Sequence, residues 1–124
     1  NGWAVLDNRE LCPVGWKVPT ENEWSVVVNF LGGIETTSAS MKASEGWAEN
    51  GHGNNSSGFS ALPGGYRQST GAFNYAGQLG WWWTSSSESP YGTAFWIGYD
   101  DGSNFTDWQS LGYGMSVRCI QDAE

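Results

Sequence analysis

Basic side chains are scarce in this chain of 124 residues. Five Lys and Arg residues stand against thirteen Asp and Glu residues, which gives a formal net charge of −8 at pH 7. Binding to nucleic-acid phosphates or to an anionic membrane surface needs clustered cations. The five here are scattered, at Arg9, Lys17, Lys42, Arg67 and Arg118. We therefore exclude nucleic acid and anionic lipid as partners.

Long apolar runs are also missing. The longest are a few residues, such as Val26 to Val28, whereas a helix that spans a bilayer needs about 20. The sequence thus predicts no membrane insertion. No linker rich in Pro, Ser or Gly divides the chain, and its length suits one hydrophobic core. We expect residues 1–124 to form a single domain that is monomeric in isolation.

Groups that would catalyse a reaction are few. The only histidine, His52, lies in a glycine-rich loop, and no nucleophile stands in a Gly-x-Ser-x-Gly motif. A glycosidase needs only two carboxylates, and Glu88, Asp100, Asp101 and Asp107 are available. Solvated loop carboxylates are the commoner explanation for such residues. We expect a protein that is not an enzyme.

Cysteine occurs only twice, at Cys12 and Cys119. Neither has a neighbouring Cys or His that would complete a metal site. The two can form a disulfide or remain free buried thiols, and the disulfide is the simpler interpretation. Such a bond would stabilise the fold by about 2–4 kcal/mol. It would also place the protein outside the cytoplasm, in the extracellular space, at the cell surface or in the periplasm.

Glycine and aromatic residues are abundant, with 18 Gly, 9 Trp, 5 Tyr and 5 Phe. One helix is well marked: Thr20 and Glu23 form a capping-box pattern, and Gly32 ends the segment. Within it Trp24, Val27, Val28 and Leu31 recur at helical spacing, which predicts a face packed on a sheet. Between Ser38 and Trp47 the pattern fits either a short second helix or an irregular turn.

Short runs of β-branched and aromatic residues follow, separated by turn residues. They cover residues 59–62, 79–84, 93–99, 105–108 and 115–120. The Asp101-Gly102 pair predicts a hairpin. A helix followed by short antiparallel strands and long irregular loops is typical of an α+β domain.

Five short sequence motifs follow one another along the chain. They are Cys12-Pro-x-Gly-Trp16, Val18-Pro-Thr-Glu-x-Glu-Trp24, Gly58-Phe-Ser-Ala-Leu-Pro-Gly-Gly-Tyr-Arg67, Trp82-Trp-Thr-Ser-Ser86 and Gly114-Met-Ser-Val-Arg-Cys119. This order resembles the Fibrobacter succinogenes major paralogous domain (FISUMP), a secreted bacterial family with a C-type-lectin-like fold. That fold is shared with variable proteins of diversity-generating retroelements and with the formylglycine-generating-enzyme group.

The resemblance implies a disulfide between Cys12 and Cys119. It also implies that residues 89–113 form the exposed, ligand-binding face, apart from strand residues that point inward. Arg67 and Arg118 lie in the family phrases, and we expect them to be structural donors of hydrogen bonds or ion pairs.

The same stretch mixes aromatic residues with Ser, Gly, Asn and Asp, as antibody paratopes do. We expect Tyr91, Trp96 and Trp108 to stack on sugar rings, and Asp100, Asn104, Asp107 and Gln109 to bind hydroxyls. Tyr113 completes the candidate site. Along the strand at 95–99, Phe95, Ile97 and Tyr99 should point one way and Trp96 the other. Trp82 and Trp83 are expected in the core or at its rim, and Trp96 and Trp108 at the surface.

Calcium is the one metal with suitable donors here, namely Asp100, Asp101, Asn104 and Asp107. The spacing is not that of an EF-hand, and the Glu-Pro-Asn phrase of sugar-binding C-type lectins is absent. We expect no cofactor, and keep Ca²⁺ at Asp100, Asp101 and Asp107 as an alternative.

The sequence therefore favours a non-catalytic ligand-binding domain of a secreted or cell-surface bacterial protein, with carbohydrate binding and adhesion as its function. Two alternatives remain. The first is a protein-recognition domain, such as a diversified receptor or tropism-type variable protein, and the second is a structural spacer.

Overall fold

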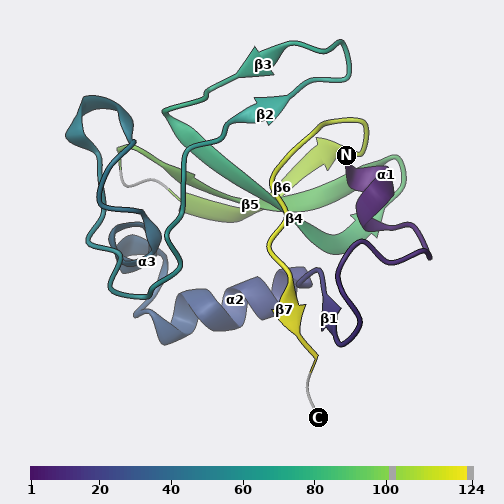
Figure 1. Cartoon of the computed structure of the whole chain (residues 1–124), viewed down its shortest axis with the longest axis horizontal. Helices are drawn as coiled ribbons and strands as arrows, with labels where there is room; N and C mark the ends of the chain where they lie inside the picture. Colours follow the sequence, from purple (N-terminus) through teal and green to yellow (C-terminus); the bar gives the residue numbers. More distant parts are fainter. Residues whose placement is uncertain (101–102, 123–124) are drawn as a thin grey trace.

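The centre of the protein is a three-stranded antiparallel sheet with strand order β4-β5-β6. Its strands are β4 (Leu79–Glu88), β5 (Tyr91–Gly98) and β6 (Ser103–Ser110). The computed structural model describes the backbone of residues 1–100 and 103–122, and the side chains of residues 1–100 and 108–122. In Figure 1 the sheet lies between helix α2 below and a small hairpin above.

The other elements are short. The helices are α1 (Gly2–Val5), α2 (Glu21–Phe30), α3 (Ile34–Met41) and the 3-10 turn η1 (Ala48–Asn50). Two further antiparallel pairs join β1 (Trp16–Lys17) to β7 (Ile120–Gln121) and β2 (Tyr66–Arg67) to β3 (Phe73–Asn74). The mixed α+β class is therefore confirmed, as short helices with small antiparallel sheets. No helix among the described residues has the length and apolarity to cross a bilayer.

Helix α2 begins where its capping box predicts. The Thr20 side chain accepts a hydrogen bond from the Glu23 amide (3.1 Å), and the Glu23 carboxylate accepts one from the Thr20 amide (3.0 Å). These two bonds satisfy amide groups that the first turn otherwise leaves unpaired. The helix ends at Gly32 and Gly33, whose φ values of 97° and 107° suit glycine far better than other residues.

Helix α3 differs from the expectation. The sequence suggested a weak helix or turn over residues 38–47, whereas the helix spans Ile34–Met41. Its N-cap is Gly33, which has no side chain to mark the start, and four of its eight residues are Thr or Ser. Because these residues are poor helix formers, local sequence indicates this helix only weakly.

Two of the five predicted strands are wrong. Residues 59–62 and most of 115–120 contribute only isolated bridges, Ala61 with Lys42 and Ser116 with Trp82, followed by the two-residue β7. A single bridge supplies too few consecutive ladder bonds to make a strand. Of the remaining three runs, 79–84 and 105–108 lie within β4 and β6, and 93–99 lies within β5 except for Tyr99. The predicted hairpin turn, Asp101-Gly102, lies outside the described residues, but the strands on either side of it pair with Ile97 opposite Ser103.

Side chains on the two faces of the sheet form two separate clusters. The cluster on the helix side contains Trp24, Val28, Met41, Trp47, Ala61, Trp82, Phe95 and Ile97, with Tyr99 packed against it. The cluster on the hairpin side contains Trp81, Trp83, Ala94 and Leu111, with Trp96 and Tyr113 packed against it. The predicted alternation of Phe95, Ile97 and Tyr99 against Trp96 is thus confirmed, as is the burial of Trp82 and Trp83.

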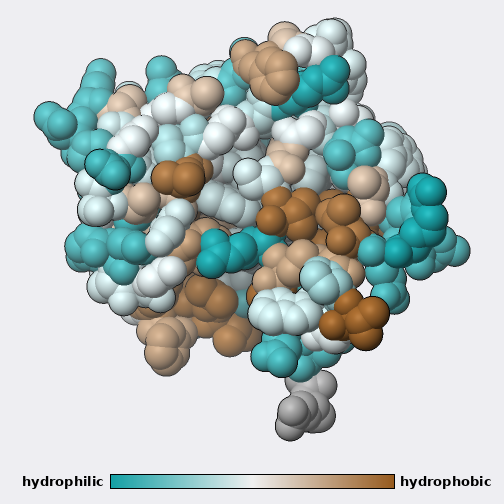
Figure 2. All heavy atoms as spheres, in the orientation of Figure 1, coloured by the Kyte–Doolittle hydropathy of each residue, from teal (hydrophilic) through white to brown (hydrophobic). Residues whose placement is uncertain are grey.

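The outer surface of α2 is more apolar than expected. Trp24 and Val28 are buried, but Val27, predicted to pack on the sheet, is 38% exposed, and Phe30 is 86% exposed. The ten-residue helix covers the sheet with only two fully buried side chains. Figure 2 shows apolar atoms gathered at the lower left of this face, where Figure 1 places α2.

Candidate ligand-binding site

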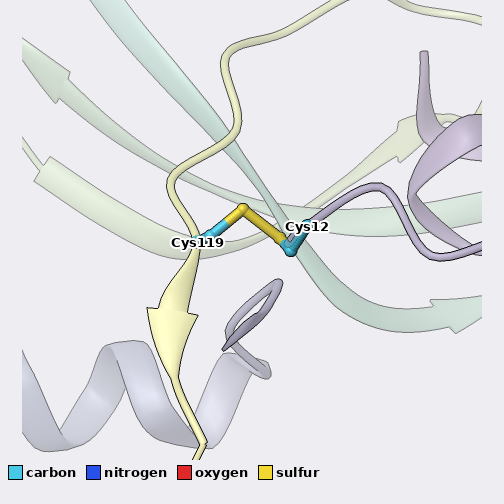
Figure 3. The surroundings of a disulfide bond; sticks show 2 residues. All are labelled: Cys12 and Cys119. Carbon is cyan, nitrogen blue, oxygen red and sulfur yellow. A yellow bond between two sulfur atoms is a disulfide. The ribbon is translucent and has the colours of Figure 1, made fainter. Parts of the chain in front are cut away.

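The two ends of the chain are clamped together beside α2. Cys12, on the segment between α1 and β1, forms a disulfide with Cys119, which directly precedes β7 (Figure 3). The predicted pairing is confirmed. The bond closes a loop of 107 residues, and the antiparallel pairing of β1 with β7 lies next to it. The disulfide and the β1–β7 pairing thus hold the two terminal regions together.

Tyr91 and Trp108 form a pair of half-exposed rings at one end of the sheet. Tyr91 is 51% exposed and Trp108 is 53% exposed. Trp108 on β6 lies opposite Thr93 on β5, and Tyr91 lies opposite Ser110. Because side chains two apart on a strand share a face, Tyr91 and Trp108 are diagonal neighbours on one face. Two aromatic rings are thereby presented to solvent from rigid strands.

Trp96 and Tyr113 belong to a different surface. Trp96 is only partly exposed, because its ring packs against Trp81 at 6.0 Å between centroids. The expectation that Trp96 lies at the surface is therefore met only in part. Tyr113 stacks on Tyr66 at 5.4 Å with an interplanar angle of 14°. Both residues lie on the hairpin side of the sheet.

The polar residues predicted to bind sugar hydroxyls also do not gather around the Tyr91–Trp108 pair. Asp100 is exposed just beyond the far end of β5. Gln109 is half-buried and follows Trp108 directly on β6, so strand alternation turns its side chain to the opposite face of the sheet. The side chains of Asn104 and Asp107 lie outside the described residues. Tyr91 and Gly98 mark the two ends of β5, which are about 23 Å apart at the usual rise of a strand. Asp100 therefore does not reach a ligand seated on the Tyr91–Trp108 pair unless that ligand is several sugar rings long.

The same distance bears on the carboxylates proposed for glycoside hydrolysis. Glu88 pairs with Tyr91 at one end of β5, and Asp100 follows Gly98 at the other. Hydrolysis needs two carboxyl groups about 5–9.5 Å apart, so Glu88 and Asp100 do not form such a pair. The side chains of Asp101 and Asp107 lie outside the described residues.

Metal ligands do not gather in the part of the chain that the structure describes. Within residues 1–100 and 108–122, no group of three His, Cys, Asp or Glu side chains is placed to hold an ion. Of the calcium candidates only Asp100 falls in this part. Those at Asp101, Asn104 and Asp107 lie outside the described side chains.

Two tyrosines that the sequence did not indicate join the hairpin side. Tyr66 on β2 lies between Tyr75 (5.8 Å) and Tyr113 (5.4 Å), and its ring meets Trp81 edge-on. Tyr75 is 50% exposed and has φ of 63°, an unusual backbone conformation for a bulky residue. No sequence pattern could have placed them, because two-residue strands leave too short a stretch for alternation to be recognised.

The exposed arginines differ in what they contact. Arg118 donates a hydrogen bond from Nη1 to the Phe59 carbonyl (2.9 Å) and lies 4.3 Å above the Phe59 ring. Its expected structural role is confirmed. Arg67 lies on β2 with its side chain exposed, and its guanidinium has no hydrogen-bond or ion-pair partner among the described residues. The described residues therefore give no support to the expected structural role of the Arg67 side chain, which stays a prediction.

Comparison with known proteins gives one finding. The model of the Fibrobacter succinogenes major domain (Fib_succ_major) matches residues 1–121. No curated protein and no solved structure matches the chain.

Proposed function

The chain belongs to the Fibrobacter succinogenes major domain family, and we propose that it is a non-catalytic ligand-binding domain whose ligand is a carbohydrate. The observation that carries this proposal is the Tyr91–Trp108 pair. Two half-exposed rings on neighbouring strands supply flat apolar area for the C–H faces of sugars.

Rigidity supports this assignment. Thr93, opposite Trp108, is 1% exposed, and its hydroxyl lies 2.6 Å from that of Thr84 on β4. The Glu21 amide at the start of α2 donates to Ser86 Oγ (3.0 Å), which ties the helix to the same end of the sheet. Rings mounted on such a framework lose little conformational entropy when a ligand binds. An adhesion module gains affinity in this way from a small contact area.

A C-type-lectin-like fold is part of the proposal. Paired terminal strands, a disulfide that joins the ends, and helices packed on one face of an antiparallel sheet support it. The kinship with retroelement-diversified proteins and with the formylglycine-generating-enzyme fold is proposed on the sequence phrases alone. The disulfide supports a location outside the cytoplasm, as disulfides persist in oxidising compartments.

The direct experiment is a binding screen against soluble glycans and insoluble polysaccharides, with and without Ca²⁺. The test variant is Tyr91→Ala/Trp108→Ala, and the matched control is Phe30→Ala, which removes an 86% exposed ring elsewhere. We expect the wild-type and control proteins to bind and the double variant to lose binding while its circular dichroism is unchanged. Absence of binding to every glycan, or equal binding by all three proteins, contradicts the proposal.

Recognition of a protein is the second candidate function, and the outer surface of α2 favours it. Two apolar hollows of about 260 and 300 Å³ share Val27, Phe59 and Arg118 as lining residues. Phe30 and Val26 are exposed beside them. If the glycan screen fails, Phe30→Ala becomes the test variant for a protein ligand and Tyr91→Ala/Trp108→Ala its control.

A further inference from the structure

Arg67 differs from the other basic residues of this acidic protein. Arg9 pairs with Asp7 (2.9 Å), Lys17 pairs with Glu23 (3.1 Å), the Lys42 ammonium donates to the Gly51 carbonyl (2.6 Å), and Arg118 donates to the Phe59 carbonyl (2.9 Å). Among the described residues, Arg67 alone of the five has no side-chain partner. With a net charge of −8, carboxylates are plentiful. A partnerless guanidinium therefore indicates a group left available for a ligand.

The backbone of Arg67 is nevertheless firmly held. Its amide donates to the Gly114 carbonyl and its carbonyl accepts from the Gly114 amide, both at 2.8 Å. A Cβ at Gly114 would lie 3.3 Å from the Arg67 Cβ, so the two chains approach closely there. The backbone at position 67 is thus fixed, while the guanidinium has no partner among the described residues, the arrangement that preorganised binding requires.

A shallow hollow of about 310 Å³ lies beside this side chain. Its lining residues are Gly64, Gly65, Tyr66, Arg67, Phe73, Gly114, Met115 and Ser116. Arg67 and Phe73 are cross-strand partners in the β2–β3 pair, so their side chains leave the hairpin on the same face. Phe73 is 77% exposed. No Asp or Glu lines the hollow, and Arg67 is its only charged lining residue.

These groups define the chemistry of the ligand. A guanidinium presents parallel N–H donors that match a carboxylate, and an exposed phenyl ring offers a flat surface to a sugar ring. We propose that the hollow at β2–β3 is a subsite for a uronic acid residue, with its carboxylate on Arg67 and its ring against Phe73. The inference rests on the proposed function, because it names a class of carbohydrate.

The negative net charge of the protein helps to interpret a test of uronate binding. An acidic protein repels polyanions as a whole, so binding of a uronate oligomer must come from a local site. The probes are short oligomers of galacturonate, mannuronate and glucuronate-substituted xylan, each alongside its methyl ester. Esterification removes the carboxylate charge and leaves the sugar ring in place, so it isolates the contact with Arg67.

The variants are Arg67→Gln and Phe73→Ala, with Arg9→Gln as the control for charge. Arg9→Gln changes the net charge by the same amount at a distant, exposed site. By calorimetry we expect at least one uronate oligomer to bind, and its affinity to fall about tenfold or more in Arg67→Gln and on esterification. Phe73→Ala should also weaken binding, and Arg9→Gln should not.

Three results overturn the inference. One is equal weakening by Arg67→Gln and Arg9→Gln, and another is equal binding of the acid and its ester. The third is binding of neutral glycans through Tyr91 and Trp108 with no uronate bound, which leaves the proposed function standing. Failure of every glycan, neutral or acidic, overturns both proposals.

Discussion

The two faces of the central sheet carry aromatic clusters of different kinds. On the helix side Trp24 stacks on Phe95 at 4.8 Å, and both are at most 3% exposed. On the hairpin side the rings form a chain from buried Trp81 through Tyr66 to Tyr75, which is 50% exposed. The first cluster is a closed core under α2 and α3. The second opens to solvent, so aromatic content alone does not distinguish core from binding surface.

Neighbouring residues on β5 allow this difference to be measured. Phe95 is fully buried in the helix-side cluster, and Trp96 is partly exposed on the opposite face. We expect Phe95→Ala to lower the free energy of unfolding by about 3–5 kcal/mol, through lost burial and a cavity. Trp96→Ala should cost about 1–2 kcal/mol, because its site can partly fill with water. Urea denaturation measures both, and equal losses would mean that the hairpin side is as closed as the helix side.

The disulfide joins the two ends of the chain and should support both faces. Replacement of Cys12 and Cys119 by Ser releases a loop of 107 residues, and we expect a loss of about 2–4 kcal/mol. Near-ultraviolet circular dichroism at raised temperature should show both sets of tryptophans loosening in one transition. Two separate transitions would show that the faces are independent units.

The capping box tests the helix that closes the first face. Thr20→Ala should cost about 1 kcal/mol, measured by urea denaturation. A matched Ser25→Ala change in the middle of α2 should cost less, because Ser25 takes no part in the cap.

The same cap makes stability depend on pH. Partial burial raises the pKa of Glu23, but the Thr20 amide and Lys17 outweigh it and hold the pKa below its ordinary value of 4.5. Because the folded-state pKa is depressed, the stabilisation is present above the ordinary value and is lost as the pH falls through the folded-state pKa. Glu23→Gln should flatten this part of the curve of unfolding free energy against pH. An unchanged curve would contradict the assignment.

How far the sequence predicted the fold depended on the range of the interactions. The start of α2 is set by Thr20 and Glu23, three residues apart, and was predicted correctly. The contrast between Phe95 and Trp96 follows from strand alternation, which is also local. The positions of Tyr66 and Tyr75 depend on the β2–β3 pair, whose strands are only two residues long, and on its contact with β4 at Gly80. No local sequence pattern encodes this contact.

The candidate site was predicted in part for the same reason. Tyr91 and Trp108 lie together because β5 and β6 form a hairpin, which the turn residues indicated. Trp96 and Tyr113 lie on the other face, where packing against Trp81 and Tyr66 decides their exposure. That Arg67 has no partner among the described residues depends on where the other charged side chains lie in the fold, so only the structure reveals it.

The surface pair should contribute least to stability. Tyr91→Ala and Trp108→Ala each remove a ring that is about half exposed, and we expect changes within about 0.5 kcal/mol in unfolding free energy. Their effect on glycan binding should be large. A stability loss comparable to that of Phe95→Ala would place these rings in the core.

The most direct test of carbohydrate binding at the Tyr91–Trp108 pair is to follow the indole N–H resonances of the nine tryptophans by NMR while a bound glycan from the screen is titrated in. We predict that the resonance of half-exposed Trp108 shifts with saturation, while those of buried Trp24 and Trp82 stay in place. Saturable binding that leaves Trp108 unmoved would contradict the account.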